Sequence, residues 1–158
     1  MSLEHLRKKP NIVLIITDQE REVMHWPEGW AEANLPARSR LMAHGLRFAN
    51  ATCNSATCSP SRATLLTGLY PAQHGVKTLL QSDRPRNRAQ NRLPVLPRHL
   101  PNLARVLEEA GYYVVYKGKF HLSRPCKYNV FEKRHNWSEA DVEHVADSYG
   151  FHEWNPPD

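Results

Sequence analysis

Cysteine and glycine are both scarce in this chain. Its 158 residues include 3 cysteines and 7 glycines. The cysteines are Cys53, Cys58 and Cys126, an odd number without a C-x-x-C pair. This pattern argues against a disulfide framework or a zinc site. We therefore expect reduced thiols, or one modified cysteine among otherwise structural ones.

Long hydrophobic runs are also absent. The longest apolar run covers residues 12–16, far short of the ~18 residues that a membrane-spanning helix needs, so we expect no membrane partner. The first ten residues carry charges and contain no apolar core, so they do not resemble a secretory signal. As given, the chain is expected to be cytoplasmic. If an upstream leader is missing, it would be periplasmic or secreted.

Positive charge is in excess, with a net charge of +5. Much of it comes from Arg84, Arg86, Arg88, Arg92 and Arg98. Such a run can bind nucleic acid or an anionic substrate. However, prolines interrupt it and no aromatic residue lies within it, which argues against a recognition helix. We favour a solvated loop and expect no nucleic-acid partner. The alternative is a non-catalytic fragment that binds anions.

Two segments predict an α/β fold. Residues 11–17 are continuously apolar and β-branched, as in strands buried on both faces of a parallel sheet. Asp18 and Gln19 follow them, at the end of a strand where α/β proteins bind ligands. Residues 102–110 have helical spacing and precede a second apolar strand at 112–116. The composition fits a single domain, residues 1–158.

A further helix is predicted just after Cys58. Pro60 suits the first helical position, Ser59 suits the cap before it, and Gly68 suits the residue after its end. Cys58 would then lie at a helix N-terminus. Residues 36–44 predict another helix, which begins at a proline and stops at a glycine.

Weaker patterns cover the remaining segments. Residues 46–51 predict a short strand, and residues 138–141 resemble a capping box before a helix that ends near residue 147. Irregular structure is expected for residues 20–36, 69–101 and 150–158.

The most specific pattern begins at Cys58. Residues 58–68 read C-S-P-S-R-A-T-L-L-T-G, which matches the sulfatase signature C-x-P-S-R-x-x-L-x-T-G at every fixed position. A second segment, Gly111-Tyr112 with residues 118–121 (G-K-F-H), is similar to the signature G-Y-x-T…G-K-x-H, except that Val114 replaces threonine. The chain therefore resembles the formylglycine-dependent sulfatases of the alkaline phosphatase-like superfamily. This resemblance implies a sandwich with a mostly parallel central sheet, of which residues 1–158 are the incomplete N-terminal part.

The chemistry of a sulfate ester agrees with these residue types. A helix N-terminus at Cys58 offers free N–H groups to an oxyanion. Arg62 lies one helical turn further on and can reach back to the same end. Lys119 adds a cation, and His121 can exchange a proton near neutral pH.

The resemblance also implies a mechanism. A maturation enzyme oxidises Cys58 to formylglycine, whose hydrate attacks sulfur and later expels sulfate. Lys119 contacts the sulfate, His121 hydrogen-bonds the hydrate, and Arg62 orients it. The substrate would be a small-molecule or saccharide sulfate ester.

A divalent cation is implied as well, bound by Asp18, Gln19 and residue 58. We expect Ca²⁺, with Mn²⁺ or Mg²⁺ as alternatives, because hard cations prefer oxygen ligands. Gln19 stands where most relatives carry a second acid, and this substitution keeps a phosphonate or phosphate monoester hydrolase open as an alternative. No later acidic metal pair is found after His121, so the chain alone is predicted to have little or no activity. His74 either lies near the site or is a hydrogen-bonded structural histidine.

Overall fold

The computed structural model describes residues 9–21, 25–80, 95–123, 128–129, 134–135 and 145–155. The chain forms two compact units, Met1–Asn50 and Ala51–Asp158. Each unit is described by itself. No helix in the described ranges is long and apolar enough to cross a membrane.

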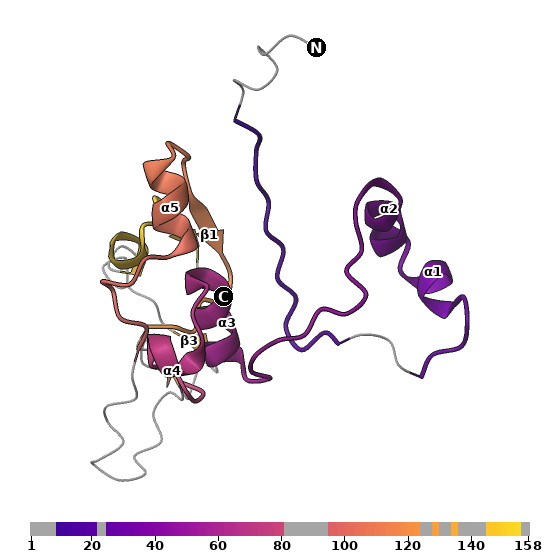
Figure 1. Ribbon diagram of the computed structural model, residues 1–158, viewed down its shortest axis with the longest axis horizontal. Coiled ribbons are helices and arrows are strands. Elements are labelled where there is room, and N and C mark those ends of the chain that lie inside the picture. The colour runs from indigo at the N-terminus through magenta and orange to yellow at the C-terminus, as the bar shows by residue number, and fades with distance from the viewer. Residues whose placement is uncertain are drawn as a thin grey trace. The chain divides into compact units, whose positions relative to one another are not determined.

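The first unit contains two short helices in succession (Figure 1). Helix α1 spans Trp30–Asn34 and helix α2 spans Pro36–His44. The predicted helix at 36–44 is confirmed, but the irregular structure predicted for residues 20–36 is wrong at α1. Gly29, at φ 77°, precedes α1, and the rings of Trp26 and Trp30 lie 4.0 Å apart. Neither helix contains a buried residue.

The apolar segment at residues 11–17 is not a strand in this structure. It has no regular secondary structure, and Val13 and Ile15 are 81% and 76% exposed. A β-branched run favours extended backbone but becomes a strand only when another strand supplies hydrogen bonds. Among the described residues, no strand pairs with it. The strand predicted at 46–51 is absent for the same reason.

The second unit begins with helices α3 (Cys58–Thr67) and α4 (Pro71–His74). Helix α3 ends as predicted at Gly68, which has φ 71° and donates its N–H to Thr64 O at 2.7 Å. Its start differs from the prediction. Thr57 is the cap residue, without a side-chain cap hydrogen bond, and Ser59 lies inside the first turn.

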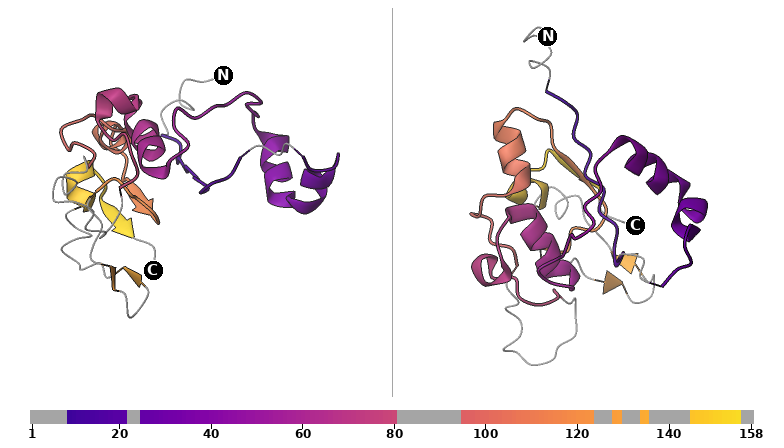
Figure 2. Two further views of the ribbon diagram at one scale, coloured as in Figure 1. Left: turned by 90° about the horizontal axis from the view of Figure 1, so that it is seen from below. Right: turned by 45° about the vertical axis from the view of Figure 1, so that its right-hand side comes forward.

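Helix α5 (Leu103–Glu109) leads into strand β1 (Val115–Lys117). Both were predicted, although the strand begins three residues later than expected. Strand β1 pairs in parallel with β4 (Glu153–Asn155), and the two appear as neighbouring arrows in Figure 2. The prediction of irregular structure at residues 150–158 is therefore wrong. The coarse α/β prediction holds in this helix and its parallel strand pair.

Two smaller features complete the second unit. Strands β2 (Tyr128–Asn129) and β3 (Arg134–His135) pair antiparallel. Residues 145–149 are helical, two residues beyond the predicted end, and the predicted start of that helix lies outside the described residues.

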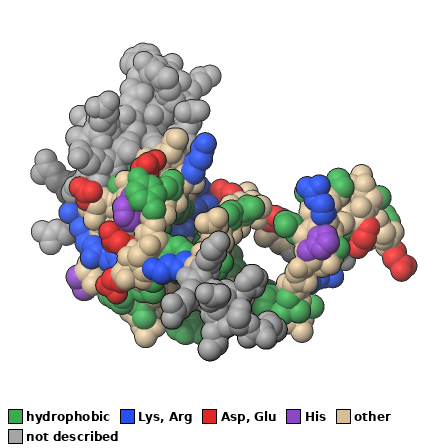
Figure 3. Space-filling view, turned by 90° about the horizontal axis from the view of Figure 1, so that it is seen from above, with side chains coloured by type: hydrophobic (Ala, Val, Ile, Leu, Met, Phe, Trp, Pro, Cys, Tyr) green, Lys and Arg blue, Asp and Glu red, His purple; other side chains and the backbone are tan. Residues whose placement is uncertain are grey.

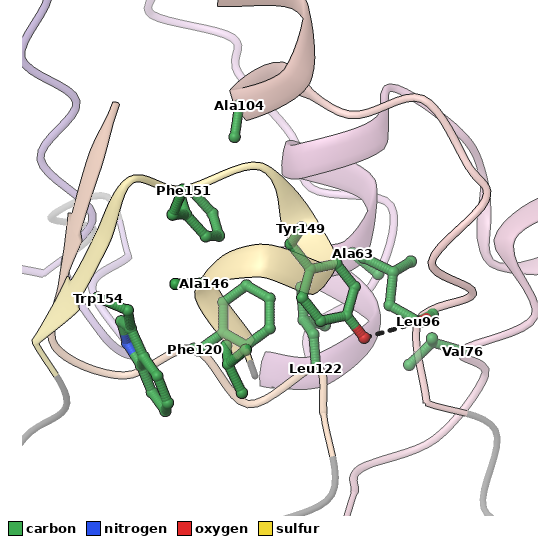
Figure 4. Packing of buried hydrophobic residues seen from close by; sticks show 11 residues of the cluster. Ala63, Val76, Leu96, Ala104, Phe120, Leu122, Ala146, Tyr149, Phe151 and Trp154 are labelled. Atoms are coloured by element: carbon green, nitrogen blue, oxygen red, sulfur yellow. Dashed lines mark hydrogen bonds between the residues drawn. The ribbon is translucent and has the colours of Figure 1, made fainter. Parts of the chain in front are cut away.

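The hydrophobic core of the described chain lies in the second unit (Figure 4). Phe120 is at its centre, with ring contacts to Tyr116, Tyr149, Phe151 and Trp154. Burial raises the pKa of Tyr149 to about 12, and its hydroxyl donates to Leu96 O at 2.8 Å. The core thus fixes the residues on both sides of Phe120. Other apolar side chains stay at the surface, where Figure 3 shows them among charged groups.

Candidate active site

The N-terminus of α3 presents Cys58, which is partly exposed. The first backbone hydrogen bond of the helix runs from Ser61 N to Thr57 O at 3.0 Å. The N–H groups before Ser61 therefore lie in the unsatisfied first turn of the helix. No acidic residue lies in that turn, so nothing there offsets the positive end of the helix dipole. This end of α3 can accept an anionic group.

Arg62 connects the two signature segments. One nitrogen of its guanidinium group donates to Lys119 O at 2.7 Å and to the Tyr116 hydroxyl at 3.2 Å. The Tyr116 hydroxyl also donates to Lys119 O at 2.7 Å. Burial raises the pKa of Tyr116, and the nearby Arg62 charge opposes that rise. In the described chain, both hydrogen bonds of Arg62 thus hold the Lys119 segment beside α3.

The segment from Gly118 to His121 has an unusual backbone. Gly118 has φ 87°, and His121 has φ 58° although it carries a side chain. The indole of Trp154 donates to Gly118 O at 3.2 Å, while Nε2 of His121 donates to Leu80 O at 2.6 Å. Residues with left-handed backbone persist where surrounding contacts hold them, often at functional sites. Lys119 lies between these two anchored positions.

A second set of hydrogen bonds supports the loop before Cys58. Asn54 donates to the Thr64 hydroxyl at 2.6 Å. The same hydroxyl is 3.1 Å from Nε2 of His74. Nδ1 of His74 accepts the N–H of Val76 at 3.1 Å, so Nε2 carries the proton and donates to Thr64.

His74 is therefore a buried structural histidine, with 1% of its surface exposed. Burial lowers its pKa, and a backbone hydrogen bond opposes this effect. Of the two roles that the sequence left open, the hydrogen-bonded structural one agrees with this geometry. Sequence reasoning missed Asn54 and Thr64, because neither occupies a fixed position of the signature.

The chain is also similar in sequence to known proteins. The sequence model of the Sulfatase family matches residues 10–154. The chain belongs to the sulfatase family. The resemblance inferred from the two signatures is thereby confirmed, and an alkaline phosphatase-like α/β fold follows from it.

Several relatives of this sulfatase chain are known by name. It is 36% identical to human arylsulfatase G over 126 residues, which cover 77% of the chain and 22% of that protein. It is 31% identical to human N-acetylgalactosamine-6-sulfatase, covering 82% of the chain and 24% of that protein. It is 30% identical to the ulvan-active sulfatase of Formosa agariphila, covering 95% of the chain and 28% of that protein. The chain thus spans roughly a quarter of the length of these proteins.

The predicted metal ligands of the sulfatase chain lie in different units. Asp18 and Gln19 are exposed residues of the first unit, and Gln19 has φ 58°. Residue 58 belongs to the second unit. The carboxylate oxygens of Asp18 and the amide oxygen of Gln19 suit a hard cation. Ca²⁺ binds six to eight oxygens. No group of three His, Cys, Asp or Glu side chains forms a metal site in the described ranges.

Two other sequence predictions concern residues largely outside the described ranges. Four of the five arginines in the basic stretch, at positions 84–92, lie there, as does Cys126. Cys53 is described and is an exposed free thiol, which does not fit a role in the packing of the core.

Proposed function

We propose that this chain supplies the nucleophile-bearing part of a sulfuric ester hydrolase. The observation that supports this proposal best is the hydrogen bond from Arg62 to Lys119 O. It connects the cysteine-bearing signature to the second signature, although 57 residues separate the two positions. The Lys119 backbone is thus held beside Arg62 of α3.

Each residue has a separate role in this proposal. Converted to formylglycine, residue 58 supplies the nucleophile for sulfuryl transfer. The N–H groups at the start of α3 donate to the oxygens of the sulfate. The Lys119 ammonium group neutralises charge that develops on those oxygens. Arg62 holds the Lys119 backbone, and His121 hydrogen-bonds the hydrate of residue 58.

A divalent cation completes the proposed site. Asp18, Gln19 and residue 58 would hold it, and the cation would polarise the sulfate and the nucleophile. Ca²⁺ is the proposed ion, with Mn²⁺ and Mg²⁺ as alternatives. These residues supply fewer oxygens than Ca²⁺ requires. We therefore propose little or no turnover by the chain on its own.

The proposed substrate is a sulfate ester of a saccharide or a small molecule. Two relatives are named for saccharides, N-acetylgalactosamine in one case and ulvan in the other. Gln19, which stands where most sulfatases carry a second acid, supports a second candidate substrate, a phosphonate or phosphate monoester. An amide oxygen carries no charge, so the metal site would differ from one with two acids.

Mass spectrometry of the peptide containing residue 58 tests the proposal. After co-expression with a formylglycine-generating enzyme, we expect the mass of an aldehyde in place of the thiol. The Cys58→Ala variant is the control that cannot be converted. An unmodified thiol in an active full-length enzyme would contradict the proposal. Turnover of an aryl sulfate compared with a phosphonate monoester by that enzyme separates the two substrate classes.

Removal of the Lys119 charge gives a second test in the full-length enzyme. We expect Lys119→Ala to lower kcat/KM by roughly 100-fold or more, the usual cost of losing one electrostatic contact to a transition state. Lys117 is exposed on β1, and Lys117→Ala is the matched control that should leave kcat/KM unchanged. Equal effects of the two substitutions would remove Lys119 from the proposed site.

A further inference from the structure

Helix α3 reaches the His121 segment by two routes. Arg62 contacts it directly, through Lys119 O. The second route begins at Ser59, the residue directly after Cys58, and it passes through the backbone of Leu80. Ser59 occupies a position that the signature leaves variable, so the motif itself assigns it no role.

The second route consists of two hydrogen bonds in series. The hydroxyl of Ser59 accepts the N–H of Leu80 at 3.1 Å. The carbonyl of Leu80 accepts Nε2–H of His121 at 2.6 Å. Ser59 is 0% exposed and Leu80 is 4% exposed. Water therefore cannot readily replace the Ser59–Leu80 bond, and losing it would leave a buried N–H without an acceptor.

The backbone of His121 indicates that its position is imposed by these contacts. Its φ of 58° is left-handed, a conformation that the Cβ atom disfavours. Such a residue keeps this conformation only where its surroundings determine it. The Leu80 carbonyl is one such contact, and it also requires the proton to be on Nε2, since a carbonyl oxygen can only accept.

We propose that Ser59 is a positioning residue for His121. Through Leu80 it holds the imidazole ring with its proton on Nε2 and its lone pair on Nδ1. The helix that carries residue 58 thereby sets the tautomer and the orientation of the histidine. The catalytic meaning of this arrangement rests on the proposed function, whereas the hydrogen bonds can be tested without it.

Nuclear magnetic resonance of the ¹⁵N-labelled chain tests the proposal. At about pH 8 a histidine ring is neutral, and its nitrogen signals report the tautomer. We expect His121 to be the Nε2–H tautomer in the unsubstituted chain. In Ser59→Ala, the ring signals should shift toward a mixture of tautomers, and the Leu80 amide should exchange roughly 2- to 10-fold faster. Ser61→Ala makes the same change in the same helix, without a bond to Leu80 in the described chain, and should do neither.

Three results would overturn the proposal. One is a proton on Nδ1 of His121, or mixed tautomers, in the unsubstituted chain. Another is a folded Ser59→Ala chain with unchanged His121 signals and unchanged Leu80 exchange. If Ser59→Ala does not fold, the unsubstituted chain is measured instead. A scalar coupling between Nε2 of His121 and the Leu80 carbonyl carbon, together with slow exchange of the Leu80 amide, supports the proposal. The absence of both signals is the third result and refutes it. Failure of residue 58 to be converted would refute the proposed function but leave these signals unchanged.

Discussion

His74 shows how burial alters the chemistry of a single residue. Its ring is enclosed, and both nitrogens are engaged, with Val76 N–H on one side and the Thr64 hydroxyl on the other. A proton on Nδ1 would remove the acceptor for Val76 N–H. The neutral ring is therefore the form that the fold requires, in agreement with the lowered pKa of His74.

The stability of the chain should depend on pH through His74. Its pKa is lower in the folded than in the unfolded state, so below about pH 6.5 the unfolded chain binds the proton first and stability falls. The stability advantage of the unsubstituted chain over His74→Gln should be largest above that pH and shrink on acidification. Urea unfolding at several pH values measures it. His99 is exposed, so His99→Gln is the control. If the stability difference between the unsubstituted chain and His99→Gln shrank by the same amount on acidification, this assignment to His74 would be contradicted.

Gly150 is constrained both by its backbone and by its neighbour. It has φ 82°, and a Cβ atom there would lie 2.7 Å from Cγ of Arg105. Arg105 is itself held, since its guanidinium donates to Ser148 O at 2.9 Å. Alanine at this position would therefore meet a side chain with little freedom to move.

Gly150→Ala should lower the free energy of unfolding by more than the ~1–2 kcal/mol that a left-handed backbone alone costs. Gly68→Ala is the matched control, because Gly68 has φ 71° but no atom within 4 Å of the added Cβ. Urea midpoints of the two variants compare the costs. Equal losses would show that the contact with Arg105 is relieved without cost.

At the scale of elements, α5 depends on the cap residue that precedes it, Asn102. Asn102 is 3% exposed, and its side-chain oxygen accepts the N–H groups of Ala104 at 3.0 Å and Arg105 at 3.2 Å. These N–H groups have no partner inside the helix. The helix is the element that precedes β1 in the chain.

Asn102→Ala should cost about 1 kcal/mol of stability, and up to ~2 kcal/mol, because two N–H donors, of which that of Ala104 is buried, lose their acceptor. Asn102→Ser keeps a hydroxyl acceptor and should cost less. Chemical denaturation measures both, and hydrogen exchange at Ala104 and Arg105 should report the loss locally. If serine and alanine cost the same, the side-chain cap does not stabilise α5.

At the scale of the whole chain, the two units differ in how they are stabilised. The buried hydrophobic cluster of the described chain lies entirely in the second unit. Helices α1 and α2 of the first unit contain no buried residue. Short helices without tertiary packing are marginal in water.

Hydrogen exchange should therefore separate the two units. Backbone amides of α3 and α5 should exchange at least about tenfold more slowly than those of α1 and α2, because local opening is cheapest where few apolar contacts are broken. Mass spectrometry of peptides from the intact chain measures this. The chain is its own control, since all four helices are compared in one sample. Equal protection would show that the first unit is packed as firmly as the second.

The amino-acid sequence by itself determined the family and several local elements. The signature at residues 58–68 and the G-K-F-H segment identified a sulfatase. The bounds of α2, the end of α3 and the existence of α5 followed from prolines, glycines and helical spacing, because these features act within a few residues.

Only the tertiary structure decided which distant residues meet. Arg62 bonds Lys119 O, Ser59 reaches His121 through Leu80, and β4 pairs with β1. These contacts join segments far apart in the chain, and no local pattern encodes them. Residues 11–17 illustrate the same point. Their composition favours a strand, but a strand also needs a partner to bond with, and no described residue of this chain supplies one.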